Sequence, residues 1–159
     1  MRFGARVRWL ALLGLCAVPV AASAQETVTV DLPGSVTFDV GANQSAVGSP
    51  EPTEISFSDA ELTPGRALRI SVRADSQTFS GPDGSSYPAS SVSWSVSNVS
   101  GGVGASGTLS SSSYTQVFQS HELSPSGEAD ITWTFTRTGT ERAGSHTLNL
   151  RWKLESVQP

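Results

Sequence analysis

Cysteine is nearly absent from this chain. The only one, Cys16, lies in the N-terminal segment, and none follows it. A domain formed by the later residues therefore has no disulfide, and its stability must come from its core. The same absence excludes thiol nucleophiles, thiolate metal sites and thiol redox chemistry. Leu15 stands directly before Cys16, where lipid attachment requires a small residue, so we expect no lipid anchor.

Long hydrophobic runs are missing as well. The longest, Trp9–Val20, has about a dozen residues, whereas a membrane-spanning helix needs roughly 20. Three arginines precede this run, and Ala22-Ser23-Ala24 follows it, which is the pattern of an export signal with its cleavage site. We expect residues 1–24 to be a signal peptide and residues 25–159 to form one exported domain without a membrane span. A retained anchor is the alternative.

Basic residues are scarce in the expected domain. Seven follow residue 24, against fourteen acidic residues, which gives a net charge of −7. Nucleic acid and anionic membrane surfaces are therefore poor candidate partners. The length suffices for one domain and is too short for two.

Signatures of catalysis are also few. The histidines, His121 and His146, have no His-x-His or His-x-x-x-His spacing, so no zinc-type site is expected. The nearest approach to a nucleophile elbow, residues 104–107, lacks the Gly-x-Ser-x-Gly spacing and no helical pattern follows it. We expect no catalytic residues, no metal and no cofactor. A hydrolase that uses one of the histidines is the least favoured alternative.

The chain does contain strict alternation of apolar and polar residues. It recurs over five to eight residues at a time, between turns rich in Gly, Pro and Ser, and no helical period appears after residue 24. This pattern is typical of half-buried antiparallel strands. The expected strands are 27–32, 35–40, 54–58, 67–74, 91–97, 114–119, 131–136 and 148–154.

The predicted fold is therefore all-β: a single antiparallel β-sandwich, immunoglobulin-like, with about eight or nine strands and no disulfide. An open barrel is the alternative. Three segments are expected to be loops, 41–52, 80–91 and 101–113, although a weak strand through Val103–Leu109 is an alternative for the last.

The tryptophans share one pattern. Trp94, Trp133 and Trp152 each occur as Trp-x-apolar and each has the parity of the aliphatic residues on its strand. An exposed platform for sugar rings would place them among the polar positions instead. We therefore predict that all three are core residues, where each removes roughly 150–250 Å² from water.

Aromatic residues in the turns are the better candidates for ligand contact. Phe79, Tyr87 and Tyr114 lie beside Gly, Pro and Ser, where the backbone can present a ring to solvent. They are the predicted ligand-binding residues.

The closing segment, residues 143–154, contains a Gly-Ser-His-Thr opening followed by an alternating strand that ends in Trp152-Lys153-Leu154. It resembles the end of the WxL (Trp-x-Leu) cell-surface domain, and Trp94-Ser95-Val96 is similar to the earlier motif of that family. His146 stands where the family usually has tyrosine. The resemblance implies an exported all-β domain attached to the cell wall through peptidoglycan.

Taken together, these features predict an exported, non-catalytic structural or binding module at the cell envelope or surface, with peptidoglycan or another surface protein as its partner. Its final compartment is the periplasm, the cell surface or the medium. The alternative is a pilin-like subunit of a surface fibre, in which the segment Thr27–Leu32 is donated to the sheet of a neighbour.

Overall fold

The computed structural model describes residues 25–41, 46–82, 84–136 and 141–159, and within them the chain consists almost entirely of antiparallel strands. The expected signal peptide lies outside the described residues. In chain order the elements are β1 (Thr27–Asp31), β2 (Ser35–Val40), β3 (Ala46–Ser49), β4 (Thr53–Glu61), β5 (Ala67–Ala74), β6 (Thr78–Ser80), β7 (Ser86–Pro88), the single-turn 3-10 helix η1 (Ala89–Ser91), β8 (Val92–Ser100), β9 (Gly102–Gly104), β10 (Gly107–Thr108), β11 (Thr115–Ser120), β12 (Gly127–Phe135) and β13 (Gly144–Val157).

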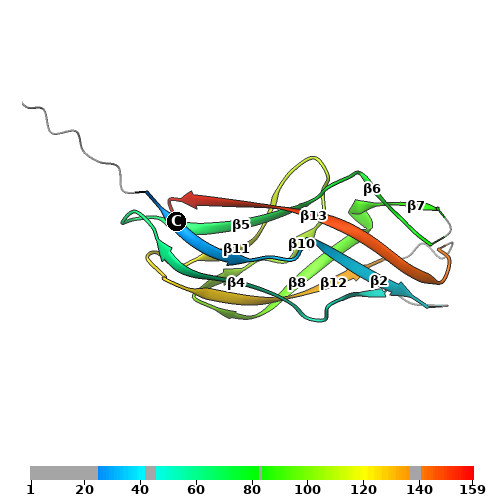
Figure 1. Cartoon of the computed structure of the whole chain (residues 1–159), viewed down its shortest axis with the longest axis horizontal. Helices are drawn as coiled ribbons and strands as arrows, with labels where there is room; N and C mark the ends of the chain where they lie inside the picture. Colours follow the sequence, from blue (N-terminus) through cyan, green and yellow to red (C-terminus); the bar gives the residue numbers. More distant parts are fainter. Residues whose placement is uncertain (1–24, 42–45, 83, 137–140) are drawn as a thin grey trace, which may run out of the picture.

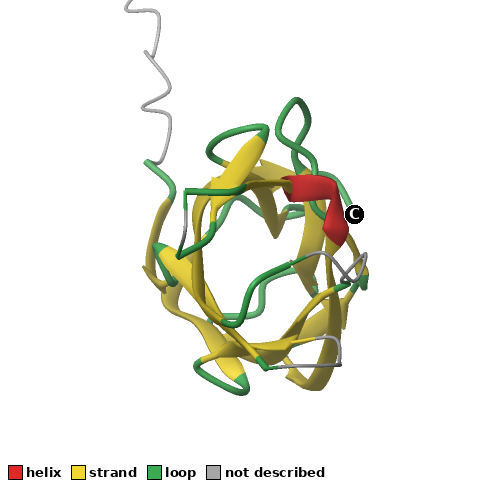
Figure 2. Ribbon diagram, turned by 90° about the vertical axis from the view of Figure 1, so that its right-hand side faces the viewer, coloured by secondary structure: helices red, strands yellow, loops and turns green. Residues whose placement is uncertain are grey.

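The strands form two layers that extend along the long axis of the molecule (Figure 1). The first sheet contains β1, β4, β12, β8 and β10, and the second contains β9, β11, β5, β13 and β2, with β6 and β7 beside β13. Strand β3 pairs with β12 of the first sheet and with β2 of the second, so hydrogen bonds join the layers on that side. Seen from the end, the strands curl around a common interior (Figure 2).

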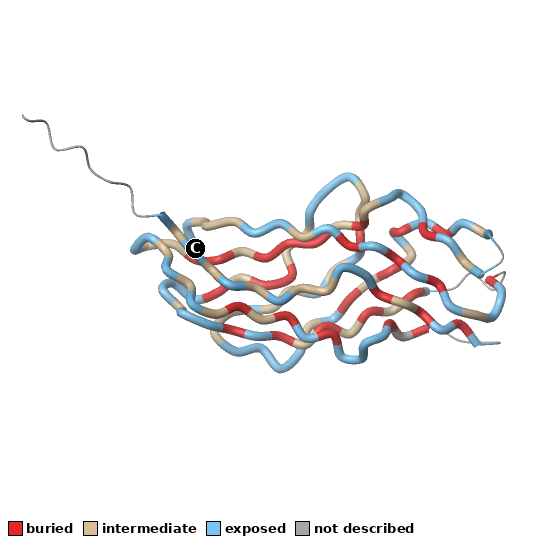
Figure 3. Tube along the Cα trace, in the orientation of Figure 1, coloured by how far each residue is buried: buried red, intermediate tan, exposed pale blue. Residues whose placement is uncertain are grey.

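Burial alternates along the strands, as Figure 3 shows. On β12, for example, Ala129, Ile131, Trp133 and Phe135 are buried while the residues between them are partly exposed. This follows from the strand geometry, which sends successive side chains to opposite faces, so that the apolar positions of both sheets meet in one core.

The all-β antiparallel sandwich is thus confirmed, and each of the eight predicted strands has its counterpart. The strand count differs, because the structure adds five short strands, β3, β6, β7, β9 and β10. Four of these lie in segments that were expected to be loops. A strand of two to four residues is too short to show alternation, so pairing with a neighbour reveals it where the sequence cannot.

Within the part of the chain that the structure describes, no helix has the length and hydropathy to cross a membrane.

Candidate functional site

Basic side chains gather on the outward face of the second sheet. The alternation that points apolar residues of β5 and β13 inward points Arg69, Arg73, Arg151 and Lys153 outward. The two strands are paired neighbours, and Arg151 lies directly opposite Arg73. These four residues, which we term the cationic face, are more than half of the seven basic residues that follow residue 24.

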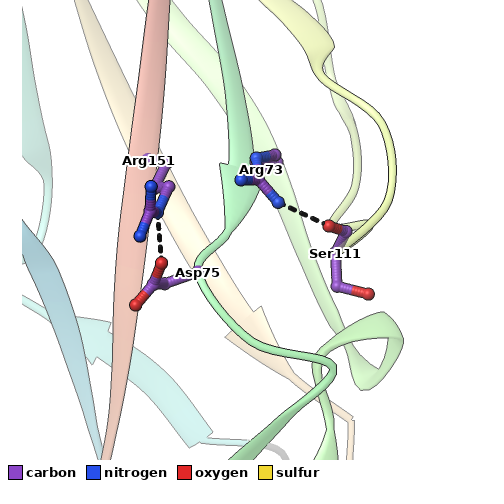
Figure 4. Close-up of polar contacts among 4 residues, drawn as sticks. All are labelled: Arg73, Asp75, Ser111 and Arg151. Atoms are coloured by element: carbon purple, nitrogen blue, oxygen red, sulfur yellow. Dashed lines mark hydrogen bonds and ion pairs between the residues drawn. The ribbon is translucent and has the colours of Figure 1, made fainter.

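The two arginines at the centre of this face are directed away from each other. Directly opposed like charges destabilise a sheet unless each finds another partner. The Arg151 guanidinium pairs with the carboxylate of Asp75, just beyond β5, and Nη1 of Arg73 donates to the backbone oxygen of Ser111 at 2.7 Å (Figure 4). The partners hold both guanidinium groups in place while the Arg151 side chain stays 58% exposed.

Tyr114 adds an aromatic ring to the cationic face. It precedes β11 and is 39% exposed. The Arg73 guanidinium lies 5.2 Å from the ring centroid and the Lys153 ammonium 6.0 Å, distances at which a cation is attracted to the ring. Of the three predicted ligand-binding residues, this is the one whose ring the structure leaves open to solvent.

Two further contacts complete the cationic face. Lys153 pairs at 2.7 Å with Glu155, two residues further along β13, and both side chains remain partly exposed. Arg69 lies 3.4 Å from the amide oxygen of Gln119 on β11. The exposed ion pair of Lys153 with Glu155 contributes little to stability, about 0–1 kcal/mol, so Lys153 remains available to a partner.

The outward face of the first sheet has the opposite charge. Glu54 and Asp130 lie directly opposite each other on β4 and β12, and Glu128 is two residues away on the same strand. Asn98 donates a hydrogen bond to Asp130 at 2.7 Å. The domain therefore presents a cationic side and an acidic side, which its net charge of −7 conceals.

A second polar cluster holds the strand ends together at the β4–β5 turn. The backbone N–H of Thr63 donates to Glu26 Oε1 at 2.9 Å, and Arg66 Nη2 donates to the Ser156 carbonyl at 2.7 Å. The pKa of Glu26 lies below its ordinary value, chiefly because of the Thr63 backbone hydrogen bond and then because of the Ser156 hydroxyl. Both contacts connect the turn to a strand end, so we interpret this cluster as structural.

Phe79 and Tyr87 correct the expectation that their rings face solvent. They are 5% and 9% exposed, and their centroids lie 5.9 Å apart in an aromatic cluster with Phe135 and His146. The reason is that residues 78–80 and 86–88 form the paired strands β6 and β7, whose rings turn toward the core and not outward from a loop.

The tryptophans occupy the core to different degrees. Trp94 and Trp133 are buried and lie opposite each other on β8 and β12, with centroids 5.7 Å apart. Trp152 is partly buried against the same core, and its indole N–H donates to the Pro33 carbonyl at 2.6 Å. The parity prediction therefore places the first two indoles correctly and overstates the burial of the third.

The two histidines have different environments. His146 is fully buried; its Nδ1 donates to the Gly144 carbonyl at 2.9 Å, and its Nε2 has no hydrogen-bond partner within the part of the chain that the structure describes. His121 is exposed and borders an open pocket of about 330 Å³ together with Ser120 and Glu122. The Ser120 hydroxyl is engaged by two backbone groups, as acceptor from Leu68 N–H and donor to the His121 carbonyl, so it is not poised as a nucleophile.

No set of three or more metal-ligating side chains converges among the residues described. The cationic face offers guanidinium and ammonium donors on a flat sheet, beside one aromatic ring.

Comparison with known proteins adds no family. No family model, curated protein or solved structure matches this chain. The cationic face therefore has to be interpreted from its own geometry.

Sequence reasoning did not find this face. The signal was present in the same alternation that located the core, because the polar positions of the runs 67–74 and 148–154 hold the four basic residues. What the sequence does not show is that these two runs, more than 70 residues apart, are adjacent strands.

Proposed function

We propose that this chain is an exported, non-catalytic binding module that attaches to a negatively charged polymer of the cell envelope, with peptidoglycan as the leading partner. The observation that supports this most directly is the cationic face beside the exposed ring of Tyr114, on a protein that is otherwise acidic. The resemblance of residues 143–154 to the WxL domain favours the same partner.

The geometry of the face suits an extended polymer. Neighbouring strands are about 4.8 Å apart and alternate residues on a strand about 6.8 Å, so the four cations form a flat array. Peptidoglycan presents carboxylates on the stem peptides, which recur along its glycan strands. Arginine donates to such groups in pairs of hydrogen bonds, and an aromatic ring packs against sugar. A flat array with several weak contacts favours a polymer over a small ligand, which needs a concave pocket.

The test is co-sedimentation of the purified chain with purified peptidoglycan. We expect Arg73→Glu to weaken binding at least about tenfold, ~1.4 kcal/mol, because it removes charge-assisted hydrogen bonds and adds repulsion. The matched control is Arg142→Glu, an equal charge change at an exposed arginine outside the cationic face. Peptidoglycan with its carboxylates converted to amides is the polymer control. Equal binding by the two variants would contradict the proposal, as would a wild-type chain that stays in solution.

A second candidate function is a fibre subunit assembled by strand exchange. The observation that favours it is the position of β1, which ends the strand order of the first sheet and pairs only with β4 among the strands described. Its apolar residues Val28 and Val30 are only partly buried. Donation of β1 to a neighbour produces open-ended chains, whose length grows with concentration and which require residues 25–32.

A further inference from the structure

Strand β13 has an edge that is only half covered. Its first part pairs with β2 through Asn149, and the N–H of Leu150 donates to the Gly34 carbonyl at 2.9 Å. There the preceding chain leaves for the first sheet, where β1 pairs with β4. Beyond Leu150, no residue that the structure describes pairs with this edge of β13, although β5 covers the other edge to Val157.

The backbone groups on this edge can be identified from the ladder. Asn149 accepts from the N–H of Asp75 on the β5 side, whereas Leu150 donates toward β2. Because N–H and C=O of one residue point to the same side and alternate along an antiparallel strand, those of Trp152, Leu154 and Ser156 point to the open edge. Of these backbone groups, the Ser156 carbonyl alone has a partner among the residues described, Arg66 Nη2.

An apolar side chain is left exposed beside this edge. Leu154 has the parity of the core residues of β13, yet it is 40% exposed, and Trp152 before it is only partly buried. Leu154 is therefore incompletely covered by the rest of the domain, and a strand added at this edge would cover it further.

The sequence of this edge is complementary to itself in a single antiparallel register. Pairing centred on Lys153 opposes two lysines, pairing centred on Glu155 opposes two glutamates, and pairing centred on Trp152 opposes Arg151 to Lys153. Only pairing centred on Leu154 places Lys153 opposite Glu155 of a second copy, twice by symmetry. Opposite charges across a sheet are favourable and like charges unfavourable, so charge selects this register.

We propose that two copies of this chain form a symmetric dimer through the open edge of β13, with Leu154 of both copies on the twofold axis. The second sheet then continues across the two molecules. Leu154 packs against its counterpart and exchanges two backbone hydrogen bonds with it, and Trp152 faces Ser156 on either side. Lys153 and Glu155 of the two copies form an alternating group of four charges on the outward face.

The dimer is closed and weak, and it goes beyond the proposed binding function. A twofold-symmetric interface uses the same edge of both copies, so no edge of this kind remains for a third copy. A ladder of only three edge residues buries little area, so we expect a dissociation constant between about 1 µM and 1 mM. The arrangement brings two cationic faces into one surface, although dimerisation does not require that they bind anything.

Charge exchange between two variants tests the register. Wild-type chain is expected to dimerise with concentration in sedimentation equilibrium. Lys153→Glu alone and Glu155→Lys alone should each lose at least about tenfold in self-association, because both oppose like charges at the axis. Mixed in equal amounts, the two variants should form a heterodimer, since glutamates of one then face lysines of the other. Intrachain pairing of residues 153 and 155 cannot produce this rescue.

Several outcomes would overturn the proposal: a wild-type chain that is monomeric to about 1 mM, variants that self-associate like wild type, or a mixture that stays monomeric while circular dichroism shows both variants folded. Open-ended polymers abolished by removal of residues 25–32 would instead support strand exchange. Loss of dimerisation leaves the Arg73 binding test unaffected, so the two proposals fail separately.

A crosslink supplies a second, geometric test. Residues in a hydrogen-bonded antiparallel pair have Cα atoms about 5.5 Å apart, within the range that a disulfide spans. In a Cys16→Ser background, Leu154→Cys should therefore form a disulfide-linked dimer under mild oxidation. Leu123→Cys is the matched control, since Leu123 is an exposed leucine on the turn between β11 and β12 and not on the open edge of β13. Equal crosslinking of the two variants would contradict the register.

Discussion

At the scale of single residues, Trp94 explains why a glycine-rich segment is ordered. Its indole N–H donates to the Ala105 carbonyl at 2.8 Å, and the two-residue strand β10 pairs beside it. A Cβ on Gly107 would lie 2.6 Å from Cζ2 of that indole. The segment 101–113, which its composition predicts to be a loop, therefore covers a core tryptophan.

The close contact at Gly107 makes a prediction about stability. We expect Gly107→Ala to lower the free energy of unfolding by about 1–3 kcal/mol, because the added methyl forces the indole or β10 to shift. Urea denaturation measures it. The matched control is Gly34→Ala, where no atom lies within 4 Å of the added Cβ and the effect should be close to zero. Equal losses at the two positions would show that β10 does not press on Trp94.

At the scale of elements, the switch of the chain from β1 to β2 makes β1 an edge of the first sheet and leaves the second half of β13 without a partner strand on that side among the residues described. Pro33 and Gly34 end the pairing with β4 and begin the pairing with β13. The sequence predicts this turn and both flanking strands from alternation. It does not predict that they belong to different sheets, because the partner of a strand is fixed by contacts distant in the sequence.

The Glu26 contact predicts how the attachment of β1 depends on pH. Because the pKa of Glu26 is lowered in the folded chain, its contribution to stability is fully present above the ordinary carboxyl pKa and is lost as the pH falls through the lowered value. Glu26→Gln should therefore reduce the free energy of unfolding at neutral pH and have a diminishing effect in acid.

Urea titrations at a series of pH values measure that difference. Glu122→Gln, at another glutamate on the surface, is the control for the general effect of removing one negative charge. A difference between wild type and Glu26→Gln that is constant across the acid range would show that the Thr63 hydrogen bond does not depend on ionisation.

At the scale of the whole molecule, charge is distributed by sheet. The cationic face occupies the second sheet, and the acidic residues of β4 and β12 occupy the first. The net charge, which follows directly from the sequence, is negative and by itself argues against anionic partners. The local field near a face depends on the charges within about one Debye length, roughly 8–10 Å in physiological salt, so a binding face can have the opposite sign to the molecule.

This distribution predicts a strong dependence of polymer binding on salt. Raising the salt from roughly 0.05 to 0.5 M should release the wild-type chain from peptidoglycan, since screening weakens the attraction at the cationic face. Arg73→Glu should show a shallower dependence, because it has fewer opposite charges to screen. Co-sedimentation across a salt series measures both slopes. Binding that is unchanged by salt would attribute attachment to apolar contact instead.

The shared strand β3 has a consequence for local opening. Strand β3 is hydrogen-bonded to both layers, so separating the layers on that side breaks two ladders at once. On the opposite side the two sheets end in β9, of three residues, and β10, of two residues. Transient opening of the interior is therefore expected on the side of β9 and β10. Water, proteases or oxidants would reach the buried indoles of Trp94 and Trp133 by way of the β9–β10 margin, and the part of the other flank that β3 joins would open last.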